Sequence, residues 1–294
     1  MGIEKVGVLG CGLMGAGIAL LCAQSGFYTV VREVDQKFID KGFGLIERKL
    51  NKSVEKGKIS EDDKNAMFNR LESALELEAL KDCDLIIEAV VENLEIKNEM
   101  FSSLDKICPK ETILASNTSS LTIMAMAAST NRPDRFCGLH FFNPVPVMQL
   151  VEVVKTRATS QETADICLQF CRQIGKAPIL AKDKSGFIVN RLLIPYLLDA
   201  IRVFEEGLAS TEDIDTGMKL GLNYPIGPLI LLDFVGLDTT YSIANIMFEE
   251  FRERRFTPPP LLKKMFPAGY HGRKSGKGFY DYSGDKPVPN NLSI

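Results

Sequence analysis

In Lys5-Val6-Gly7-Val8-Leu9-Gly10-Cys11-Gly12-Leu13-Met14-Gly15, a strand pattern runs directly into a G-x-G-x-x-G motif. This arrangement is the strongest indication of the fold of the chain. A helical pattern follows the third glycine, from Ala16 to Ser25. In this motif the first glycine allows a tight turn, the second lets the backbone approach a pyrophosphate, and the third lets the helix pack against the strand. The N-terminus of the helix then faces the anion. This context favours a dinucleotide-binding unit over a glycine turn that binds nothing.

An acidic residue stands where such a unit presents a carboxylate to the adenosine ribose. The next strand pattern ends at Arg32, and Glu33 follows it, 21 residues after Gly12. A carboxylate at this point accepts hydrogen bonds from both ribose hydroxyls and repels a 2′-phosphate. The pattern therefore predicts NAD rather than NADP as the cofactor, although the adjacent Arg32 weakens that preference. Asp35 is the alternative ribose ligand, but it lies beyond the predicted strand.

Short β-branched runs alternate with helical patterns as far as about residue 185, which predicts an α/β fold with a Rossmann-like, doubly wound and mainly parallel sheet. A lysine-rich, two-helix excursion over about residues 36–70 is too long for an ordinary connection, so we expect it to project from the sheet. Beyond residue 185 no strand alternation appears. We therefore expect an NAD-binding domain over residues 1–185 and an all-α domain over residues 186–294. Strands are predicted at Lys5–Leu9, Thr29–Arg32, Leu85–Ala89, Thr112–Ala115, Phe136–His140, Leu150–Val154 and Ile179–Ala181.

Composition and charge exclude several classes of protein. The chain has 294 residues, 45% of them hydrophobic and 25% charged, which is ordinary for a globular protein of two domains. A net charge of −3 gives no reason to expect a nucleic acid or an anionic membrane as a partner. The longest apolar runs are shorter than the ~18–20 residues of a membrane span. Since the sequence opens on a strand pattern, we expect no signal peptide and a cytoplasmic location.

Cysteine and histidine usage limits the chemistry further. The seven cysteines form no CxxC pair, and we interpret them as reduced thiols in the core of a cytosolic protein. The only histidines are His140 and His271, which argues against a zinc site, and we expect no metal. A reaction that needs an imidazole base must use one of these two side chains.

A histidine and a carboxylate stand at suggestive places in two predicted strands. His140 ends an apolar strand, and the carboxyl edge of a parallel sheet is where ligands bind. Glu152 interrupts the aliphatic run Leu150–Val154, where a carboxylate is costly unless it is paired. If the two strands are neighbours, Glu152 can fix the tautomer of His140 and favour the imidazolium. The alternatives are a hydrogen-bonded core histidine and a carboxylate on an exposed edge strand.

Two further polar features stand out. Ser116-Asn117-Thr118-Ser119-Ser120 follows a predicted strand, and such a cluster of hydroxyls is either a ligand-binding loop or a helix N-cap. Asn190 lies inside the predicted helical stretch Phe187–Glu206, where asparagine has a poor propensity. We interpret Asn190 as a polar contact in the domain cleft.

Taken together, these motifs resemble the L-3-hydroxyacyl-CoA dehydrogenase family, and within it most closely the bacterial 3-hydroxybutyryl-CoA dehydrogenases. The resemblance covers nearly the whole chain and rests on the segments Gly10–Gly15, Ala89–Asn93, Ala115–Ser120, His140–Pro146, Leu150–Val153, Gly186–Arg191 and Gly272–Tyr280. It implies that the chain interconverts (S)-3-hydroxyacyl-CoA and 3-oxoacyl-CoA, with NAD as cofactor. Many members of the family carry aspartate at the position of Glu33, which keeps the charge but places it one methylene closer to the backbone.

The resemblance also implies roles for particular residues. The implied catalytic set is Ser119, His140, Glu152 and Asn190, of which Ser119 and Asn190 hold the substrate hydroxyl and the thioester carbonyl. The implied cofactor contacts are Gly10, Cys11, Gly12, Leu13, Met14, Gly15, Glu33, Glu92, Lys97, Ser119, Asn143 and Lys274. Lys49 and Lys56 of the excursion correspond to the region that meets the phosphates of CoA. The all-α domain is implied to form a homodimer.

Two alternatives to this interpretation stay open. A β-hydroxyacid dehydrogenase that acts on free acids shares the cofactor domain, but that group typically uses a lysine base rather than a histidine and a glutamate. A non-catalytic, NAD-binding structural protein is the second alternative, and the complete set of candidate catalytic residues argues against it.

Overall fold

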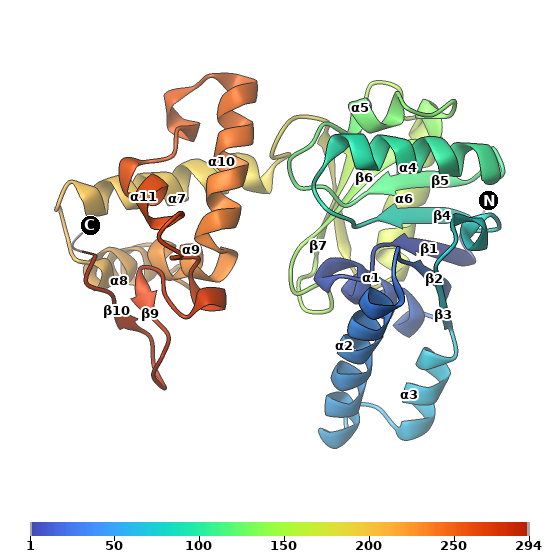
Figure 1. Ribbon diagram of the computed structural model, residues 1–294, viewed down its shortest axis with the longest axis horizontal. Helices are drawn as coiled ribbons and strands as arrows, with labels where there is room; N and C mark the ends of the chain where they lie inside the picture. Colours follow the sequence, from blue (N-terminus) through green and yellow to red (C-terminus); the bar gives the residue numbers. More distant parts are fainter. Residues whose placement is uncertain (1, 293–294) are drawn as a thin grey trace. The chain divides into compact units, whose positions relative to one another are not determined.

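A computed structural model describes residues 2–292 of the chain, which divide into two compact units with the boundary along the chain between Phe187 and Ile188. The first unit is built on one eight-stranded sheet with helices on both faces (Figure 1). The strand order is β3-β2-β1-β4-β5-β6-β7-β8, and every neighbouring pair is parallel except β6 and β7. The strands are β1 (Lys5–Leu9), β2 (Tyr28–Arg32), β3 (Leu71–Ala74), β4 (Leu85–Glu88), β5 (Ile113–Ser116), β6 (Phe136–Phe141), β7 (Leu150–Lys155) and β8 (Ala177–Lys182). The predicted doubly wound α/β architecture is confirmed.

Both faces of this sheet are apolar because helices cover both of them, as is typical of parallel sheets. Along β1, Val6 and Val8 pack toward the core under α1 and α6, whereas Leu9 packs toward the core under α4 and α5. The helices of the first unit are α1 (Leu13–Gln24), α2 (Gln36–Glu55), α3 (Glu61–Phe68), α4 (Leu94–Ile107), α5 (Ile123–Ala127) and α6 (Gln161–Gln173), with single 3₁₀ turns at Leu77–Leu80 and Pro133–Arg135.

Helices α2 and α3 form the predicted excursion and extend away from the sheet (Figure 1). The Ser60 hydroxyl accepts a hydrogen bond from the Asp63 backbone N–H, and the Asp63 carboxylate accepts one from the Ser60 N–H, so a capping box starts α3. The excursion returns to the sheet through β3. Sequence analysis did not predict β3, because its four residues, Leu-Glu-Ser-Ala, are half polar and lie at the sheet edge.

The second unit is helical, as predicted, with two additional strands of two residues each. Its elements are α7 (Val189–Glu205), α8 (Thr211–Gly221), α9 (Pro228–Val235), α10 (Leu237–Phe251), α11 (Pro260–Met265), 3₁₀ turns at Arg254–Phe256 and Arg273–Ser275, and the strands β9 (Tyr280–Asp281) and β10 (Val288–Pro289). In the described part of the chain no single helix has both the length and the apolar character needed to cross a membrane, and only α9 and α10, which form a bent pair, meet that criterion together.

Two buried carboxylates fasten the C-terminal segment to the helices of the second unit. Asp233 on α9 accepts hydrogen bonds from the backbone N–H groups of Phe279 (2.9 Å) and Tyr280 (2.8 Å). Asp215 on α8 accepts one from the Tyr280 hydroxyl (2.7 Å). Burial raises the pKa of Asp233 to about 6, although the two backbone donors and the Tyr282 hydroxyl act in the opposite direction. These contacts hold the glycine-rich C-terminal segment that carries Lys274.

Candidate active site

The carboxyl-terminal ends of β1, β2, β4, β5 and β6 lie at one edge of the sheet, because these strands are parallel. Gly10 follows β1, Glu33 follows β2, Glu88 ends β4, Ser116 ends β5, and His140 is the penultimate residue of β6. Ligands of doubly wound sheets bind along this edge. The fold therefore gathers the candidate residues of the first unit at the place where a cofactor and a substrate are expected.

The glycine motif has the geometry that the sequence predicts. Gly10 has a φ of +93°, and a Cβ atom there would lie 2.7 Å from the carbonyl oxygen of Ala89. A Cβ atom at Gly15 would lie 1.9 Å from the Gly10 carbonyl oxygen, so only glycine lets α1 approach β1 this closely. Gly12 is the N-cap of α1, and no heavy atom of the described residues lies within 4 Å of its ideal Cβ position. The loop therefore fits a pyrophosphate at the positive end of α1.

Glu33, rather than Asp35, has the position expected of the ribose ligand. Its carboxylate accepts hydrogen bonds from the backbone N–H groups of Cys11 (2.8 Å) and Val34 (2.9 Å), which orient it beside the glycine loop. A carboxylate has about four acceptor sites, so Glu33 keeps capacity for ribose hydroxyls. Asp35 instead caps α2 by accepting from the Lys37 N–H (2.9 Å). The residues present at this edge fit NAD.

Ser119, His140 and Glu152 form one hydrogen-bonded chain. The antiparallel register of β6 and β7 places His140 directly opposite Glu152, and Nδ1 of the histidine lies 2.6 Å from Oε2 of the glutamate. Ser119 Oγ lies 2.9 Å from His140 Nε2. His140 is 3% exposed and Glu152 is 0% exposed, and the rings of Phe142 and Phe187 lie 4.5 Å and 5.5 Å from the imidazole, centroid to centroid. Since the carboxylate engages Nδ1, Nε2 is the nitrogen that can exchange a proton with a ligand.

The hydroxyl cluster is not the N-cap of the following helix. Thr122 is the residue before α5, and its side chain makes no capping hydrogen bond. The carboxylate of Asp183, far along the chain, accepts from the N–H groups of Ile123 (3.0 Å) and Met124 (2.8 Å) instead. The capping alternative for Ser116–Ser120 is therefore wrong, because a tertiary contact supplies the cap and leaves the hydroxyls free for other partners.

An ion-pair network of two buried side chains, Lys97 and Glu88, and the more exposed Glu92 lies beside the segment Ser116–Ser120. Lys97 on α4 is 1% exposed, and its ammonium lies 2.5 Å from Glu88 Oε1 and 3.3 Å from Glu92 Oε2. Burial alone would raise the pKa of the Glu92 carboxyl, but Lys97 and the hydroxyls of Thr118 and Ser120 hold it below its ordinary value. Glu92 and Lys97, two of the implied cofactor contacts, are therefore joined to each other and to the segment Ser116–Ser120, here called the Ser119 loop.

Sequence analysis did not single out Glu88, although the signal was available. Glu88 ends the run Leu85-Ile86-Ile87-Glu88 as the one polar residue of a fully buried strand. The same observation, a carboxylate in an aliphatic strand, identified Glu152. Asn117 was likewise missed as a structural contact: its Oδ1 accepts a hydrogen bond from the backbone N–H of Phe141 (2.9 Å).

The structure places the remaining candidates as follows. Asn143 is exposed in the loop after β6. Asn190 and Lys274 belong to the second unit, so the contacts of the first unit do not include them. Asn190 is the second residue of α7 and 9% exposed, which corrects its predicted position in a helix interior. Lys274 donates to Asp238 Oδ2 (2.6 Å).

The two lysines of the excursion differ in exposure. Lys49 is half-buried on α2, and burial lowers the pKa of its ammonium. Lys56 is exposed and is the C-cap residue of the same helix. Both are therefore on the projecting part of the first unit.

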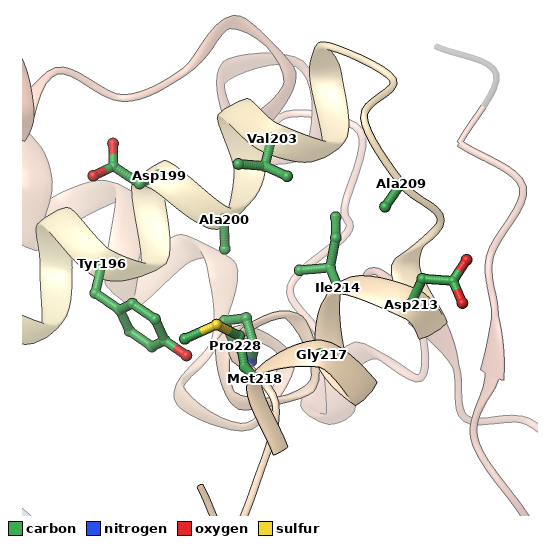
Figure 2. Close-up of a pocket in the computed structure, with 10 residues that line it drawn as sticks. All are labelled: Tyr196, Asp199, Ala200, Val203, Ala209, Asp213, Ile214, Gly217, Met218 and Pro228. Carbon is green, nitrogen blue, oxygen red and sulfur yellow. The ribbon is translucent and has the colours of Figure 1, made fainter. Parts of the chain in front are cut away.

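Residues 2–292 contain no group of three or more histidine, cysteine, aspartate or glutamate side chains that could hold a metal ion. The second unit has a mainly aliphatic cavity of about 430 Å³ between α7 and α8, shown in Figure 2. Its lining residues are Tyr196, Asp199, Ala200, Val203, Ala209, Asp213, Ile214, Gly217, Met218 and Pro228.

Comparison with known proteins gives matches over nearly the whole chain. Residues 5–184 match the family model of the 3-hydroxyacyl-CoA dehydrogenase NAD-binding domain, and residues 186–282 match that of the C-terminal domain. A protein of Deinococcus radiodurans named probable 3-hydroxybutyryl-CoA dehydrogenase is 49% identical over 95% of this chain and 100% of its own length. The human mitochondrial hydroxyacyl-coenzyme A dehydrogenase is 48% identical over 95% of this chain and 91% of its own. The crystal structure of (S)-3-hydroxybutyryl-CoA dehydrogenase from Ralstonia eutropha has a TM-score of 0.92 and 43% identity, covering 96% of this chain and 100% of that one.

Proposed function

The chain belongs to the 3-hydroxyacyl-CoA dehydrogenase family and is an NAD-dependent oxidoreductase, and from this premise we propose that it interconverts (S)-3-hydroxybutyryl-CoA and acetoacetyl-CoA. The observation that carries the proposal is the chain of hydrogen bonds from Ser119 through His140 to Glu152. The names of the similar proteins support the choice of a four-carbon acyl-CoA.

In the proposed mechanism His140 is the general acid and base. During oxidation its Nε2 accepts the proton of the substrate 3-hydroxyl, and during reduction it returns that proton. Glu152 stabilises the imidazolium by its 2.6 Å contact with Nδ1. Ser119, 2.9 Å from Nε2, marks the position of the substrate oxygen and donates a hydrogen bond to it. When bound, NAD supplies the hydride acceptor or donor.

We assign the cofactor to the edge formed by the glycine loop and Glu33. Glu33 accepts the ribose hydroxyls, and α1 faces the pyrophosphate. The other residues that we propose around the cofactor are Glu92, Lys97, Ser119, Asn143 and Lys274. For the substrate we propose that Asn190 binds the thioester carbonyl, and that Lys49 and Lys56 meet the CoA phosphates.

A spectrophotometric assay tests the substrate. NADH consumption should be rapid with acetoacetyl-CoA and much slower with acetoacetate, because the free acid lacks the phosphates and the pantetheine arm. Comparable rates with both compounds would instead favour a β-hydroxyacid dehydrogenase. No consumption with either compound would favour a non-catalytic, NAD-binding protein.

We also propose that the protein is a cytosolic homodimer. The second unit exposes three leucines at the two ends of α8, at 75% for Leu208, 80% for Leu220 and 59% for Leu222, and we assign these side chains to the dimer interface. A cytosolic location is supported by the seven buried cysteines, none of which forms a disulfide; the sulfur atoms of Cys137 and Cys167, 3.4 Å apart, are joined by a hydrogen bond only.

A further inference from the structure

The side chains of Ser116–Ser120 divide their contacts by position. The hydroxyls of Ser116, Thr118 and Ser120 all donate to carboxylates: Ser116 to Glu88 (2.6 Å), and Thr118 and Ser120 to Glu92, the latter at 3.0 Å. The two intervening side chains contact β6 instead. Asn117 accepts from the backbone of Phe141, and Ser119 reaches His140.

Because the contacts alternate, carboxylates bind one side of the segment Ser116–Ser120, and the side chains on its other side contact β6. The even-numbered residues are bound to Glu88, which is buried, and to Glu92, which is 37% exposed, so the odd-numbered side chains have fixed directions toward β6. The loop's own polar contacts add to this: Thr118 Oγ1 accepts from the N–H groups of Ser120 (3.3 Å) and Leu121 (3.0 Å).

Glu88 is the central acceptor among the groups that bind the segment Ser116–Ser120. It is 0% exposed, and its carboxylate receives three donors: Lys97 Nζ (2.5 Å), the Val90 N–H (2.7 Å) and the Ser116 hydroxyl (2.6 Å). These donors come from α4, the loop after β4 and the end of β5. Burying an ion pair is costly, and an apolar pair of similar volume often stabilises a protein as well or better. A requirement for a fixed geometry explains why the chain keeps charges here.

We propose that Glu88 is a positioning residue for the reaction, which acts through Ser116 and Lys97 to aim the Ser119 hydroxyl at Nε2 of His140. Glu88 does not touch the substrate in this proposal, which rests on the proposed function of Ser119. Lys97 shares the role, since its ammonium joins Glu88 to Glu92 and so connects both carboxylates that hold the loop.

The test is a double-mutant cycle between Glu88→Gln and Ser119→Ala. An amide presents one oxygen and an NH₂ group, so at least one of the three donors to Glu88 loses its acceptor. The Ser119 hydroxyl should then be displaced, and a displacement of ~1 Å can lower a rate by ~10²-fold. We expect Glu88→Gln to lower kcat by about 10- to 100-fold and to change the KM for acetoacetyl-CoA little. In the Ser119→Ala background the same substitution should have almost no further effect, because residues that act as one unit are not additive.

Asp105→Asn is the matched control, because it removes the negative charge of another buried ion pair, one that involves the same helix, α4. Asp105 on α4 pairs with Arg132 (2.7 Å), and neither contacts the Ser119 loop. This variant should lose thermal stability and keep kcat. If it loses kcat as Glu88→Gln does, or if the losses from Glu88→Gln and Ser119→Ala multiply, the proposal is wrong. Ser116→Ala, a milder change, must meet the same criteria if Glu88→Gln does not fold.

A readout without substrate separates this proposal from the proposed function. The chain has two histidines, so the ring resonances of His140 can be followed by NMR with His271 as an internal reference. Glu88→Gln should shift the His140 signals in the same direction as Ser119→Ala and leave those of His271 in place. Unchanged His140 signals would refute the positioning role even if acetoacetyl-CoA proved not to be a substrate.

Discussion

At Glu152 a carboxylate occupies the middle of an aliphatic strand, and its burial has a cost that only a specific partner can offset. The partner is His140 on the adjacent antiparallel strand. At Glu88 the same kind of placement has a cation, Lys97, as partner. A buried acid in an apolar strand therefore indicates a polar network in this protein.

Glu152→Gln should keep the fold and NADH binding but lower kcat by ~10²–10⁴-fold, because an amide cannot stabilise the imidazolium of His140. His140→Gln should lose a similar amount, and the double variant little more. Steady-state kinetics with NADH-binding titrations would measure this. Loss of NADH binding in Glu152→Gln would show a structural role, and multiplicative losses would show that the two residues act independently.

Glu33→Ala should narrow the preference for NADH over NADPH, expressed as the ratio of kcat/KM values, by about 10-fold or more. A hydrogen bond to a charged group contributes ~1.5–3 kcal/mol, and its loss also removes the repulsion of a 2′-phosphate. Asp35→Ala is the control, since Asp35 caps α2 and should affect stability but not this ratio. Equal use of both cofactors by the wild-type protein would contradict the assignment of Glu33.

At the scale of single elements, local patterns and long-range contacts contribute differently. Helix α3 starts at a capping box, Ser60-Glu61-Asp62-Asp63, which involves only neighbouring residues and can therefore be recognised in the sequence. Helix α5 begins at a cap supplied by Asp183, about 60 residues away, which no local pattern could indicate. Strand β3 was missed for the same reason, since its pairing with β2, rather than its composition, makes it a strand.

The two lysines proposed to bind the CoA phosphates lie on the projecting helix α2 and at its C-cap, where CoA binding can be tested by substitution. Charge reversal of Lys49 and Lys56 together should raise the KM for acetoacetyl-CoA by about 10-fold and leave the KM for NADH unchanged, because exposed charge pairs contribute up to ~1 kcal/mol each. Added salt should weaken acyl-CoA binding by the wild-type protein. The same reversal at Lys106 and Lys110, exposed lysines of the first unit, should change neither constant. An unchanged KM in the first variant would place Lys49 and Lys56 on a merely solvated face.

Asp233 should make the stability of the second unit depend on pH. Burial raises its pKa to about 6 in the folded state, above the ~3.9 of an unfolded chain, so its stabilising contribution is complete below about pH 4 and is lost as the pH rises to about 6. Asp233→Asn removes this dependence. The free energy of unfolding of the wild type minus that of the variant should therefore fall by at most about 3 kcal/mol from pH 4 to pH 6. Urea unfolding across this range measures it, and a difference that grows would contradict the assignment.

At the scale of the whole molecule, the chain separates its tasks between two units. The first unit contains the glycine loop, Glu33 and the Ser119–His140–Glu152 chain. The second unit contains Asn190 and Lys274 and exposes the side chains of Leu208, Leu220 and Leu222. This division coincides with the two matched domain models, which cover residues 5–184 and 186–282.

If the protein is a dimer through the second unit, its mass in solution should be twice the 32.6 kDa of one chain. Leu220→Asp should lower that mass toward the monomer, because a carboxylate on a buried apolar interface is costly. Leu75→Asp, a comparable change at an exposed leucine of the first unit, should leave the dimer intact. Light scattering after size-exclusion chromatography gives both masses, and a monomeric wild type would refute the proposal.

Features with local causes can be recognised in the sequence: the glycine turn after β1, the acidic residue after β2, the capping box of α3 and the polar residues that interrupt aliphatic strands. Which of these side chains contact each other depends on tertiary packing. His140 contacts Glu152 because β6 and β7 pair in one register, and a shift by a single residue would turn the two side chains to opposite faces. Glu88 meets Ser116 and Lys97 because β4, β5 and α4 pack together. Strand order and register are properties of the assembled sheet, and no single segment of the chain encodes them.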